Sequence, residues 1–452
     1  MTDNRKSIHG EWSSRFAFIL AATGSAVGLG NIWKFPYITG ENGGGAFVLV
    51  YLLCVAALGI PIMIAEIMMG RRGRQSPINT MRSLADEAGA DPRWHYVGWA
   101  GMIAGFLILA YYSVIAGWAM AYVVKAFFGG FMNSTPEEIK RLFDNLMESP
   151  IQQIFWHTLF MVVTMQVVMR GVQGGLEKSV RFLMPTLFIL LMILVAYAMS
   201  SGAYDQGIDF LFNPDFSKID ANAVLTAMGH AFFTLSLGMG AIMVYGSYLP
   251  SHVSIAKTTF FIAGADTVVA LLAGIAIFPL VFANNLEASA GPGLIFQTLP
   301  LAFGHMGGGW LFGLLFFILL FFAALTSSIS LIEPAVAWLV ENKNVERHQA
   351  CVWSGAACWV LGVGVVFSFN IWSDVKLFDK NLFELLDYLT ANLMLPLGGL
   401  AIAIFAGWTM KQSHAEQELE LPAEGFQVWQ FLIKYVSPTA VFFVFLHVLG
   451  IL

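Results

Sequence analysis

The chain has 452 residues, of which 58% are hydrophobic and 12% are charged, and its net charge is −6. This composition excludes a soluble globular protein and indicates a polytopic membrane protein. No Gly-rich nucleotide-binding loop with a Lys-Ser or Lys-Thr ending is present, so the sequence does not indicate ATP-driven transport. We expect no nucleic-acid partner.

Eleven apolar segments are long enough to cross a bilayer, whose hydrocarbon core takes about 20 helical residues. In chain order they cover residues 13–38, 43–69, 94–126, 151–169, 179–202, 222–248, 254–283, 306–340, 348–369, 382–410 and 428–451. Residues 285–303 predict a partly helical loop that dips back toward the membrane. The polar stretches are too short to bury a core of their own, so we expect one transmembrane domain over residues 1–452.

The distribution of Lys and Arg predicts the orientation, because these residues accumulate in cytoplasmic loops. With the N-terminus inside, fifteen of them fall on the cytoplasmic side and six on the other. We therefore expect a cytoplasmic N-terminus and, after eleven spans, an extracytoplasmic C-terminus. The charged run from Gln412 to Glu424, between the last two spans, is interpreted as a solvated connector.

Residues 22–36 interrupt the first apolar segment with Gly24, Gly28, Gly30 and Asn31. A break in a spanning helix survives only where it lines a cavity or binds something, because hydrocarbon satisfies no backbone groups. The freed carbonyls are oxygen ligands for a small cation, and the freed amides attract carboxylates. Close helix packing on small residues is the alternative for one such segment.

A second interruption decides between these readings. Residues 230–240 place Gly238 and Gly240 in the middle of the sixth span. Two interrupted segments in corresponding positions of two halves indicate a transporter site near the bilayer midplane. We expect one repeat over about 13–202, an inverted repeat over about 222–410, and an extra helix over about 428–451.

Three motifs carry a family resemblance that extends over nearly the whole chain. They are Gly24–Pro36 with Glu41–Phe47 just after, Phe232–Gly238, and Leu325–Ser328. Together they resemble the signature of the neurotransmitter:sodium symporter family. The resemblance implies an all-α membrane protein with a 5+5 inverted-repeat fold, broken helices 1 and 6, and an eleventh helix. Ending after eleven spans is similar to some bacterial amino-acid symporters.

The resemblance implies two sodium sites. The first comprises Ala26, Asn31, Thr234 and Asp266 together with the substrate carboxylate, and the second comprises Gly24, Val27, Ala323, Thr326 and Ser327. Both are all-oxygen sites, which suits a hard cation. For Thr326 and Ser327 the competing interpretation is that their hydroxyls bond back to their own helix.

The implied substrate pocket has a polar end and an apolar end. Its residues are Ala26, Leu29, Gly30, Ile108, Tyr112, Phe233, Thr234, Ser236, Met239, Ser327 and Leu331. No charged side chain faces the apolar end, so the pocket suits a neutral hydrophobic amino acid. Ordinary packing remains the alternative for Ile108 and Leu331.

Two gates complete the resemblance. Lys34 and Asp387, with Tyr112 and Phe233 below them, match the outer gate, and Lys stands where the family usually carries Arg. The inner gate would comprise His9, Trp12, Ser247, Tyr248 and Glu341. His9 also replaces an Arg, and histidine changes charge near neutral pH, so this contact is expected to weaken as the pH rises.

The resemblance therefore predicts sodium-coupled symport of neutral hydrophobic L-amino acids across the bacterial inner membrane, with no enzymatic chemistry. Two sodium ions are expected and chloride is not, because Asp266 supplies a negative charge. A proton-coupled permease of the same fold, a channel and a non-transporting amino-acid sensor are the alternatives. The sequence gives no indication of the preferred amino acid or of the oligomeric state.

Overall fold

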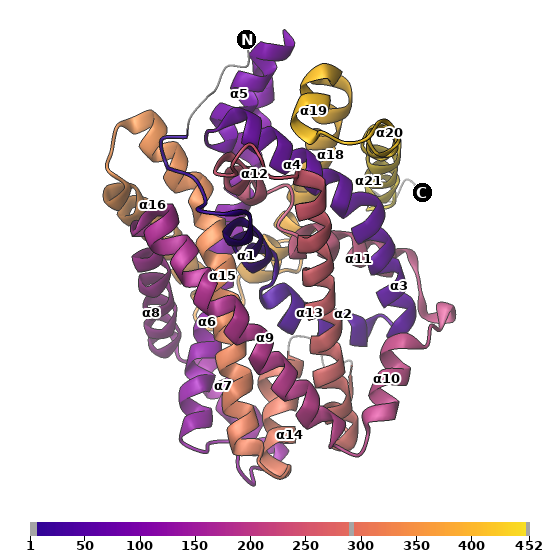
Figure 1. The fold of residues 1–452 in the computed structure, drawn as a ribbon. Helices are drawn as coiled ribbons and strands as arrows, with labels where there is room; N and C mark the ends of the chain where they lie inside the picture. The colour runs from indigo at the N-terminus through magenta and orange to yellow at the C-terminus, as the bar shows by residue number, and fades with distance from the viewer. Residues whose placement is uncertain (1–6, 289–292, 449–452) are drawn as a thin grey trace.

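The computed structural model describes residues 7–288 and 293–448 and is almost entirely helical in these ranges, without a β-sheet (Figure 1). The long helices are α1 (Arg15–Ala26) with η1 (Gly30–Lys34) and α2 (Phe35–Glu41), α3 (Gly45–Cys54) with η2 (Val55–Gly59) and α4 (Ile60–Gly73), α6 (His95–Phe127), α8 (Pro150–Met169), η4 (Val172–Glu177) with α9 (Lys178–Met199), α11 (Ala221–Thr234) with α12 (Ala241–Ser247), α13 (Ile255–Ala283), α15 (Gly309–Lys343), α16 (Arg347–Phe367), α17 (Leu382–Asp387) with η7 (Tyr388–Met394), α18 (Leu395–Ile404) and η8 (Phe405–Thr409), and α20 (Ala423–Phe431) with η9 (Leu432–Val436) and α21 (Ser437–Val448).

These helices follow the eleven predicted spans closely. Among the described residues eight helices are long and apolar enough to cross a membrane, and the bent pair Arg15–Ala26 and Gly30–Glu41 makes a ninth. The other two predicted spans are α11 with α12, which residues 235–240 interrupt, and the C-terminal helix. Residues 449–451 of that last prediction lie outside the described part of the chain.

Shorter helices connect the spans. They are α5 (Pro77–Ala88), η3 (Pro92–Trp94), α7 (Pro136–Glu148), α10 (Tyr204–Phe212), η5 (Phe216–Lys218), η6 (Leu294–Thr298), α14 (Leu299–His305) and α19 (Gln412–Leu419). The pair η6 and α14 agrees with the partly helical loop predicted for residues 285–303, of which 289–292 lie outside the described residues.

The interpretation of residues 412–424 as a solvated connector is wrong. This stretch contains α19, and Arg71 on α4 donates from Nε to Glu418 Oε2 at 2.8 Å and also binds the Glu418 carbonyl. A buried guanidinium needs several acceptors, and α19 supplies two of them. The charges of this run therefore attach α19 to the bundle.

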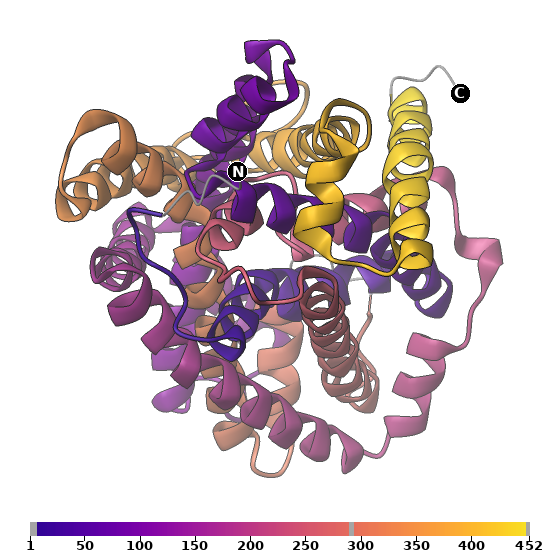
Figure 2. The same cartoon turned by 45° about the horizontal axis from the view of Figure 1, so that its top comes forward.

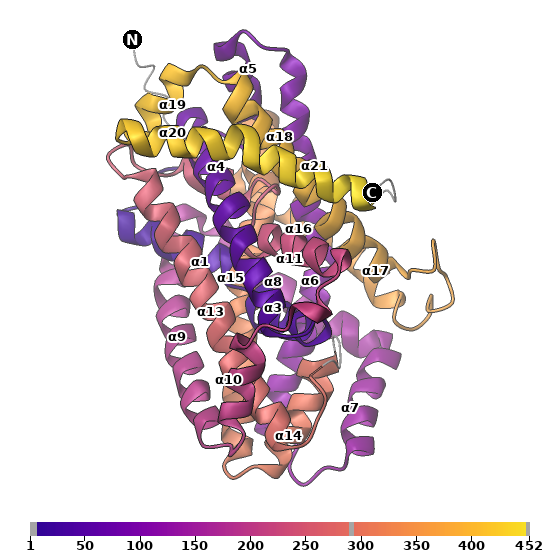
Figure 3. The ribbon, with the colours of Figure 1, turned by 90° about the vertical axis from the view of Figure 1, so that its right-hand side faces the viewer.

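The broken helices lie at the centre of the bundle. When the molecule is tilted, α1 and α12 are seen inside a ring of longer helices, with the C-terminal helix at the rim (Figure 2). In the side view, α20 and α21 cross the upper part of the bundle obliquely (Figure 3). α15 packs along α6, and α4 packs along α12. The breaks in α1 and in α11–α12 thus face one another away from lipid.

Candidate functional site

The first spanning helix is interrupted in the middle of the molecule. α1 ends at Ala26 and η1 begins four residues later, with a bend of 45° between the two halves. A Cβ on Gly28 would lie 2.3 Å from Ser327 Oγ and 2.7 Å from the Tyr112 hydroxyl oxygen, so a larger residue does not fit. The Tyr112 hydroxyl accepts a hydrogen bond from the Leu29 amide at 3.1 Å. At the break, side chains of α6 and α15 therefore contact the backbone of residues 28 and 29 directly.

The second break uses left-handed backbone. Ser236, Gly238 and Gly240 have φ angles of 55°, 74° and 75° between the end of α11 and the start of α12. The Ser236 hydroxyl donates to the Ser25 carbonyl at 2.9 Å, which ties the two breaks together. The Gly238 amide donates to Glu66 Oε1 at 2.6 Å, and Glu66 is fully buried on α4. A buried carboxylate thus satisfies an amide that the break would otherwise leave unpaired.

One cluster of oxygen atoms lies where η1, α11 and α13 meet. Asn31 donates from Nδ2 to Asp266 Oδ1 at 2.7 Å, and Thr234 donates from Oγ1 to the same oxygen at 3.1 Å. The side-chain oxygen of Asn31 accepts from the Gly28 amide at 3.0 Å. Ala26, the last residue of α1, lies just before this turn. The structure thus brings together three of the predicted first-site residues by direct contact and places Ala26 beside them.

A second cluster lies between the end of α1 and α15. Thr326 donates to the Ala323 carbonyl at 3.0 Å and lies 3.4 Å from the Val27 carbonyl. Ser327 Oγ lies 3.4 Å from the carbonyls of both Gly24 and Val27. All five residues predicted for the second site therefore converge. Thr326 also bonds to carbonyls of its own helix, as the competing interpretation of this hydroxyl expects.

A small cavity lies between the two broken helices. Its volume is about 20 Å³, roughly the room of one water molecule, so a larger occupant requires side chains to move. Nine of the eleven predicted pocket residues line it: Ala26, Gly30, Ile108, Tyr112, Phe233, Ser236, Met239, Ser327 and Leu331. Leu29 and Thr234 do not line it, whereas Ser25 and Gly28, which were not predicted, do.

An ion pair lies next to Phe233, one of the residues that line the cavity. Lys34 Nζ lies 2.8 Å from Asp387 Oδ1 and 3.1 Å from Oδ2. The same ammonium lies 4.9 Å from the centre of the Phe233 ring, which lines the cavity below it. The Tyr111 hydroxyl adds a hydrogen bond to Asp387 at 3.2 Å. The structure therefore brings the predicted outer-gate residues Lys34, Phe233 and Asp387 into one stack.

Glu341 organises the predicted inner gate. His9 Nε2 lies 3.0 Å from Glu341 Oε1, and both side chains are almost fully buried. Glu341 also accepts from the Ser76 amide at 2.7 Å and from the Asn79 side chain at 2.8 Å. Trp12 donates from its indole to the Tyr245 carbonyl at 3.0 Å. The N-terminal segment is thus bound to α12 and α15, and Glu341 also joins α15 to the start of α5.

Tyr248 contacts two other predicted inner-gate residues: its carbonyl accepts from the Trp12 amide at 3.0 Å, and its ring centre lies 5.8 Å from that of His9. The Tyr248 hydroxyl donates to Glu333 Oε1 at 2.8 Å, and Arg347 Nη2 lies 2.6 Å from Glu333 Oε2. The Ser247 hydroxyl bonds to the Val244 carbonyl of its own helix. A permanent ion pair therefore joins α16 to α15 near this end of the molecule, and a second one, between Arg74 Nη1 and Glu11 Oε1 at 3.3 Å, joins the end of α4 to the N-terminal segment.

Comparison with known proteins identifies the family to which the chain belongs. The profile of the sodium:neurotransmitter symporter family matches residues 9–135 and 138–451. The chain belongs to this family. A sodium-dependent transporter of Bacillus subtilis is 36% identical over 446 residues, which are 98% of each chain. The human sodium- and chloride-dependent GABA transporter 2 is 25% identical over 94% of this chain and 77% of its own.

A solved structure extends the similarity to three dimensions. MhsT in complex with L-phenylalanine is 42% identical, with a TM-score of 0.91 over 97% of this chain and 99% of that one. The predicted fold class is confirmed: this symporter is an all-α membrane protein with the broken-helix transporter fold. It is a transporter and not an enzyme.

The sequence alone did not predict that Glu66, Ser25 and the ion pair of Glu333 with Arg347 contribute to the site of this symporter. Glu66 and Glu333 each stand as a single carboxylate in a long apolar run, which is a signal that a partner must exist. The partner itself was not predictable, because Glu66 binds a backbone amide 172 residues away. Ser25 carried no such signal, since a serine in a spanning helix usually bonds to its own backbone.

Proposed function

We propose that this symporter carries neutral hydrophobic L-amino acids, aliphatic and aromatic, into the cell with two sodium ions by alternating access and without chloride. The observation that carries the proposal is the cavity between the two broken helices. One end of it is bare backbone, and the other is formed by Ile108, Met239 and Leu331 without a charged side chain. A charged substrate side chain would have no partner there. MhsT, which is 42% identical, was solved with L-phenylalanine.

The backbone end suits the amino and carboxyl groups that all amino acids share. The Leu29 amide and the Tyr112 hydroxyl already meet at 3.1 Å, and a substrate carboxylate would accept hydrogen bonds from both. The carbonyls near Ala26, Phe233 and Thr234 are the acceptors proposed for the ammonium group. The side chain would then lie against the apolar wall. Since the cavity is small as it stands, Phe233 and Met239 must move when the substrate enters.

The two oxygen clusters are proposed as the sodium sites. Sodium is cargo here, and it prefers carbonyl, carboxylate and hydroxyl oxygen atoms. Asn31, Thr234 and Asp266 would hold one ion beside the substrate carboxylate. Bound sodium would then raise the affinity for the substrate, and bound substrate would raise the affinity for sodium. Thr326, Ser327 and the carbonyls at the end of α1 would hold the second ion. That ion would bridge α1 to α15.

Chloride independence is proposed from Asp266. This carboxylate is fully buried and contacts Asn31 and Thr234. A buried charge requires compensation, and a cation in the first cluster provides it without a further anion. The human relative that is described as chloride-dependent is only 25% identical.

The two gates give a route for alternating access. Separation of Lys34 from Asp387 would open the cavity to the outside, and separation of His9 from Glu341 would open it to the cytoplasm. Each pair joins elements that must part for the corresponding opening: η1 and α17 for the outer pair, and the N-terminal segment and α15 for the inner pair. Binding of both ions and substrate would favour closure of the outer pair.

Uptake into proteoliposomes tests the proposal. Vesicles that contain the purified full-length chain are given labelled leucine, phenylalanine, tryptophan, glutamate or lysine under an inward sodium gradient, with choline as the control cation. We expect sodium-dependent uptake of the first three and background uptake of the charged pair. Uptake driven by a proton gradient in choline would instead indicate a proton-coupled permease. Binding without uptake would indicate a sensor.

A further inference from the structure

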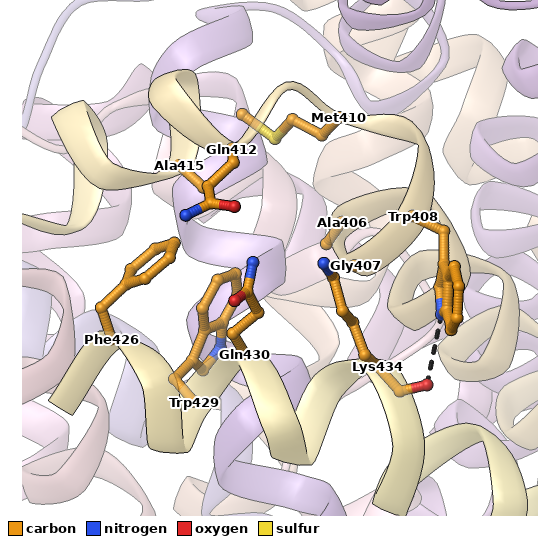
Figure 4. A pocket seen from close by; sticks show the side chains of 10 residues that line it. All are labelled: Ala406, Gly407, Trp408, Met410, Gln412, Ala415, Phe426, Trp429, Gln430 and Lys434. Atoms are coloured by element: carbon orange, nitrogen blue, oxygen red, sulfur yellow. Dashed lines mark hydrogen bonds between the residues drawn. The ribbon is translucent and has the colours of Figure 1, made fainter. Parts of the chain in front are cut away.

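A second pocket lies far from the transport cavity, between the end of the tenth span and the C-terminal helix. It has a volume of about 130 Å³ and is lined by η8, α19, α20 and η9 (Figure 4). Its floor is fixed, because the Trp429 indole donates to the Pro61 carbonyl on α4 at 3.1 Å. Several water molecules fit into this volume. The pocket shares no residue with the cavity between the broken helices.

Lys434 supplies the charge of this pocket. Its ammonium makes no ion pair and no hydrogen bond to any described residue, and its one recorded contact is the Trp408 ring, with 5.9 Å to the centroid. The side chain is partly exposed, so its ammonium is accessible to a ligand that enters the pocket. The residues that line the pocket include no Asp or Glu. The pocket is therefore cationic and has no internal counter-ion.

The backbone holds the Lys434 side chain in place. The Trp408 indole donates to the Lys434 carbonyl at 3.2 Å. A Cβ on Gly407 would lie 2.9 Å from Lys434 Cγ, so the two helices touch at this glycine and confine the stem of the lysine. Figure 4 shows the ammonium directed into the pocket, toward the amide of Gln430. That amide also has no hydrogen-bond partner among the described residues.

The surroundings place the pocket at a membrane interface. Trp408, Phe431 and Tyr435 are 60%, 57% and 52% exposed and form one aromatic edge beside it, with the Trp408 and Tyr435 rings 5.6 Å apart. Exposed Trp and Tyr residues gather at the level of lipid headgroups. The pocket also lies at the end of the molecule that carries α5 and α19 (Figure 1). The basic residues Arg71, Arg72 and Arg74 lie just before α5, whereas α19 itself carries Glu416 and Glu418 and no Lys or Arg. The positive-inside rule places that end in the cytoplasm.

We propose that this pocket binds the phosphate group of an anionic phospholipid of the cytoplasmic leaflet. Lys434 provides the charge and Gln430 a hydrogen-bond donor, as phosphate oxygens require. The aromatic edge receives the glycerol and the start of the acyl chains. A lipid is favoured over a free phosphate ion because the cationic end of the pocket continues into an exposed apolar surface. Basic pockets between spanning helices on the cytoplasmic side are suited to anionic headgroups.

Native mass spectrometry of the full-length protein tests this proposal with phosphatidylglycerol and phosphatidylcholine as probes. We expect the wild type to retain phosphatidylglycerol over phosphatidylcholine, and Lys434→Gln to weaken that retention about tenfold. Lys434→Arg should keep most of it, because Arg also binds phosphate. Lys178→Gln, which removes an exposed lysine at the start of α9, should leave it unchanged.

Three results would overturn the proposal. They are equal retention of the two lipids by the wild type, undiminished retention of phosphatidylglycerol by Lys434→Gln, and displacement of the lipid by millimolar inorganic phosphate, which would indicate a site for a soluble anion. Gln430→Glu is a second variant that leaves the lysine in place. It should also lower phosphatidylglycerol retention, because the new carboxylate repels phosphate and pairs with Lys434, and unchanged retention in this variant counts equally against the proposal.

Discussion

Asp266 has a role that can be tested without assuming the identity of the substrate. It is buried among Asn31 and Thr234, and the neighbouring residues on α13 offer no other negative charge. If this carboxylate compensates the sodium charge, replacing chloride by gluconate at fixed sodium should leave uptake within about twofold of its original rate. Asp266→Asn should lower sodium-dependent uptake at least tenfold, since an unpaired buried charge costs several kcal/mol.

The double variant Asp266→Asn with Ala270→Ser provides the control for that prediction. It removes the resident charge and adds a hydroxyl one helical turn later, where an anion can be bound. Its residual uptake should depend on chloride, whereas that of the wild type should not. Loss of wild-type uptake in gluconate would refute the assignment of Asp266.

Met239 lines the cavity, and we predict that it sets the range of substrate side chains that the cavity accepts. It is buried between two glycines with positive φ, and a thioether side chain adapts its shape at little cost. Tryptophan and phenylalanine should therefore displace bound labelled leucine. Met239→Phe should weaken tryptophan more than leucine, because it fills the same space with a rigid ring. Failure of both aromatic amino acids to compete at a thousandfold excess would exclude a wide pocket.

At the scale of the element, the break between α11 and α12 depends on Glu66. Its carboxylate accepts from the Gly238 amide at 2.6 Å, and a charged acceptor strengthens such a bond to roughly 1.5–3 kcal/mol. Glu66→Ala should therefore lower both the thermal stability of the purified protein and its affinity for substrate. Glu66→Gln retains an acceptor oxygen and should lie between the alanine variant and the wild type. Equal stability of all three proteins would show that the conformation between α11 and α12 does not depend on the hydrogen bond from Gly238 to Glu66.

The elements of this fold were largely predictable because their signals are local. Apolar length located the spans, and glycines inside two of them located the breaks. α19 was not predictable, because its attachment depends on Arg71, which is 347 residues away from Glu418. The same holds for Tyr248, which was placed in the inner gate by resemblance: its ring lies 5.8 Å from that of His9, but its hydroxyl binds Glu333, which Arg347 neutralises. Local pattern gives the helices, and long-range polar contacts decide how their ends are joined.

At the scale of the whole molecule, both predicted gate pairs are formed at once. Lys34 contacts Asp387 in the predicted outer gate, and His9 contacts Glu341 in the predicted inner gate. Under the proposed alternating access, each of these pairs would have to separate in turn. The inner gate carries less permanent charge than the outer one, because its cationic side is a histidine. The balance between inward-open and closed forms should therefore respond to this one residue.

His9→Arg tests that balance. A permanent guanidinium pairs with Glu341 more strongly than an imidazole does, so the inward-closed form should gain population. Ser247→Cys in a background without Cys54, Cys351 and Cys358 is a suitable reporter, because Ser247 is buried on α12 and bonds only to its own helix through its hydroxyl. Labelling of this cysteine from the cytoplasmic side should slow several-fold in His9→Arg. It should accelerate in Glu341→Gln, which removes the acceptor charge. A reporter that reacts at the same rate in all three backgrounds would mean that His9 and Glu341 do not hold the inner end closed, and the closing role would then pass to the contacts of Trp12 with α12.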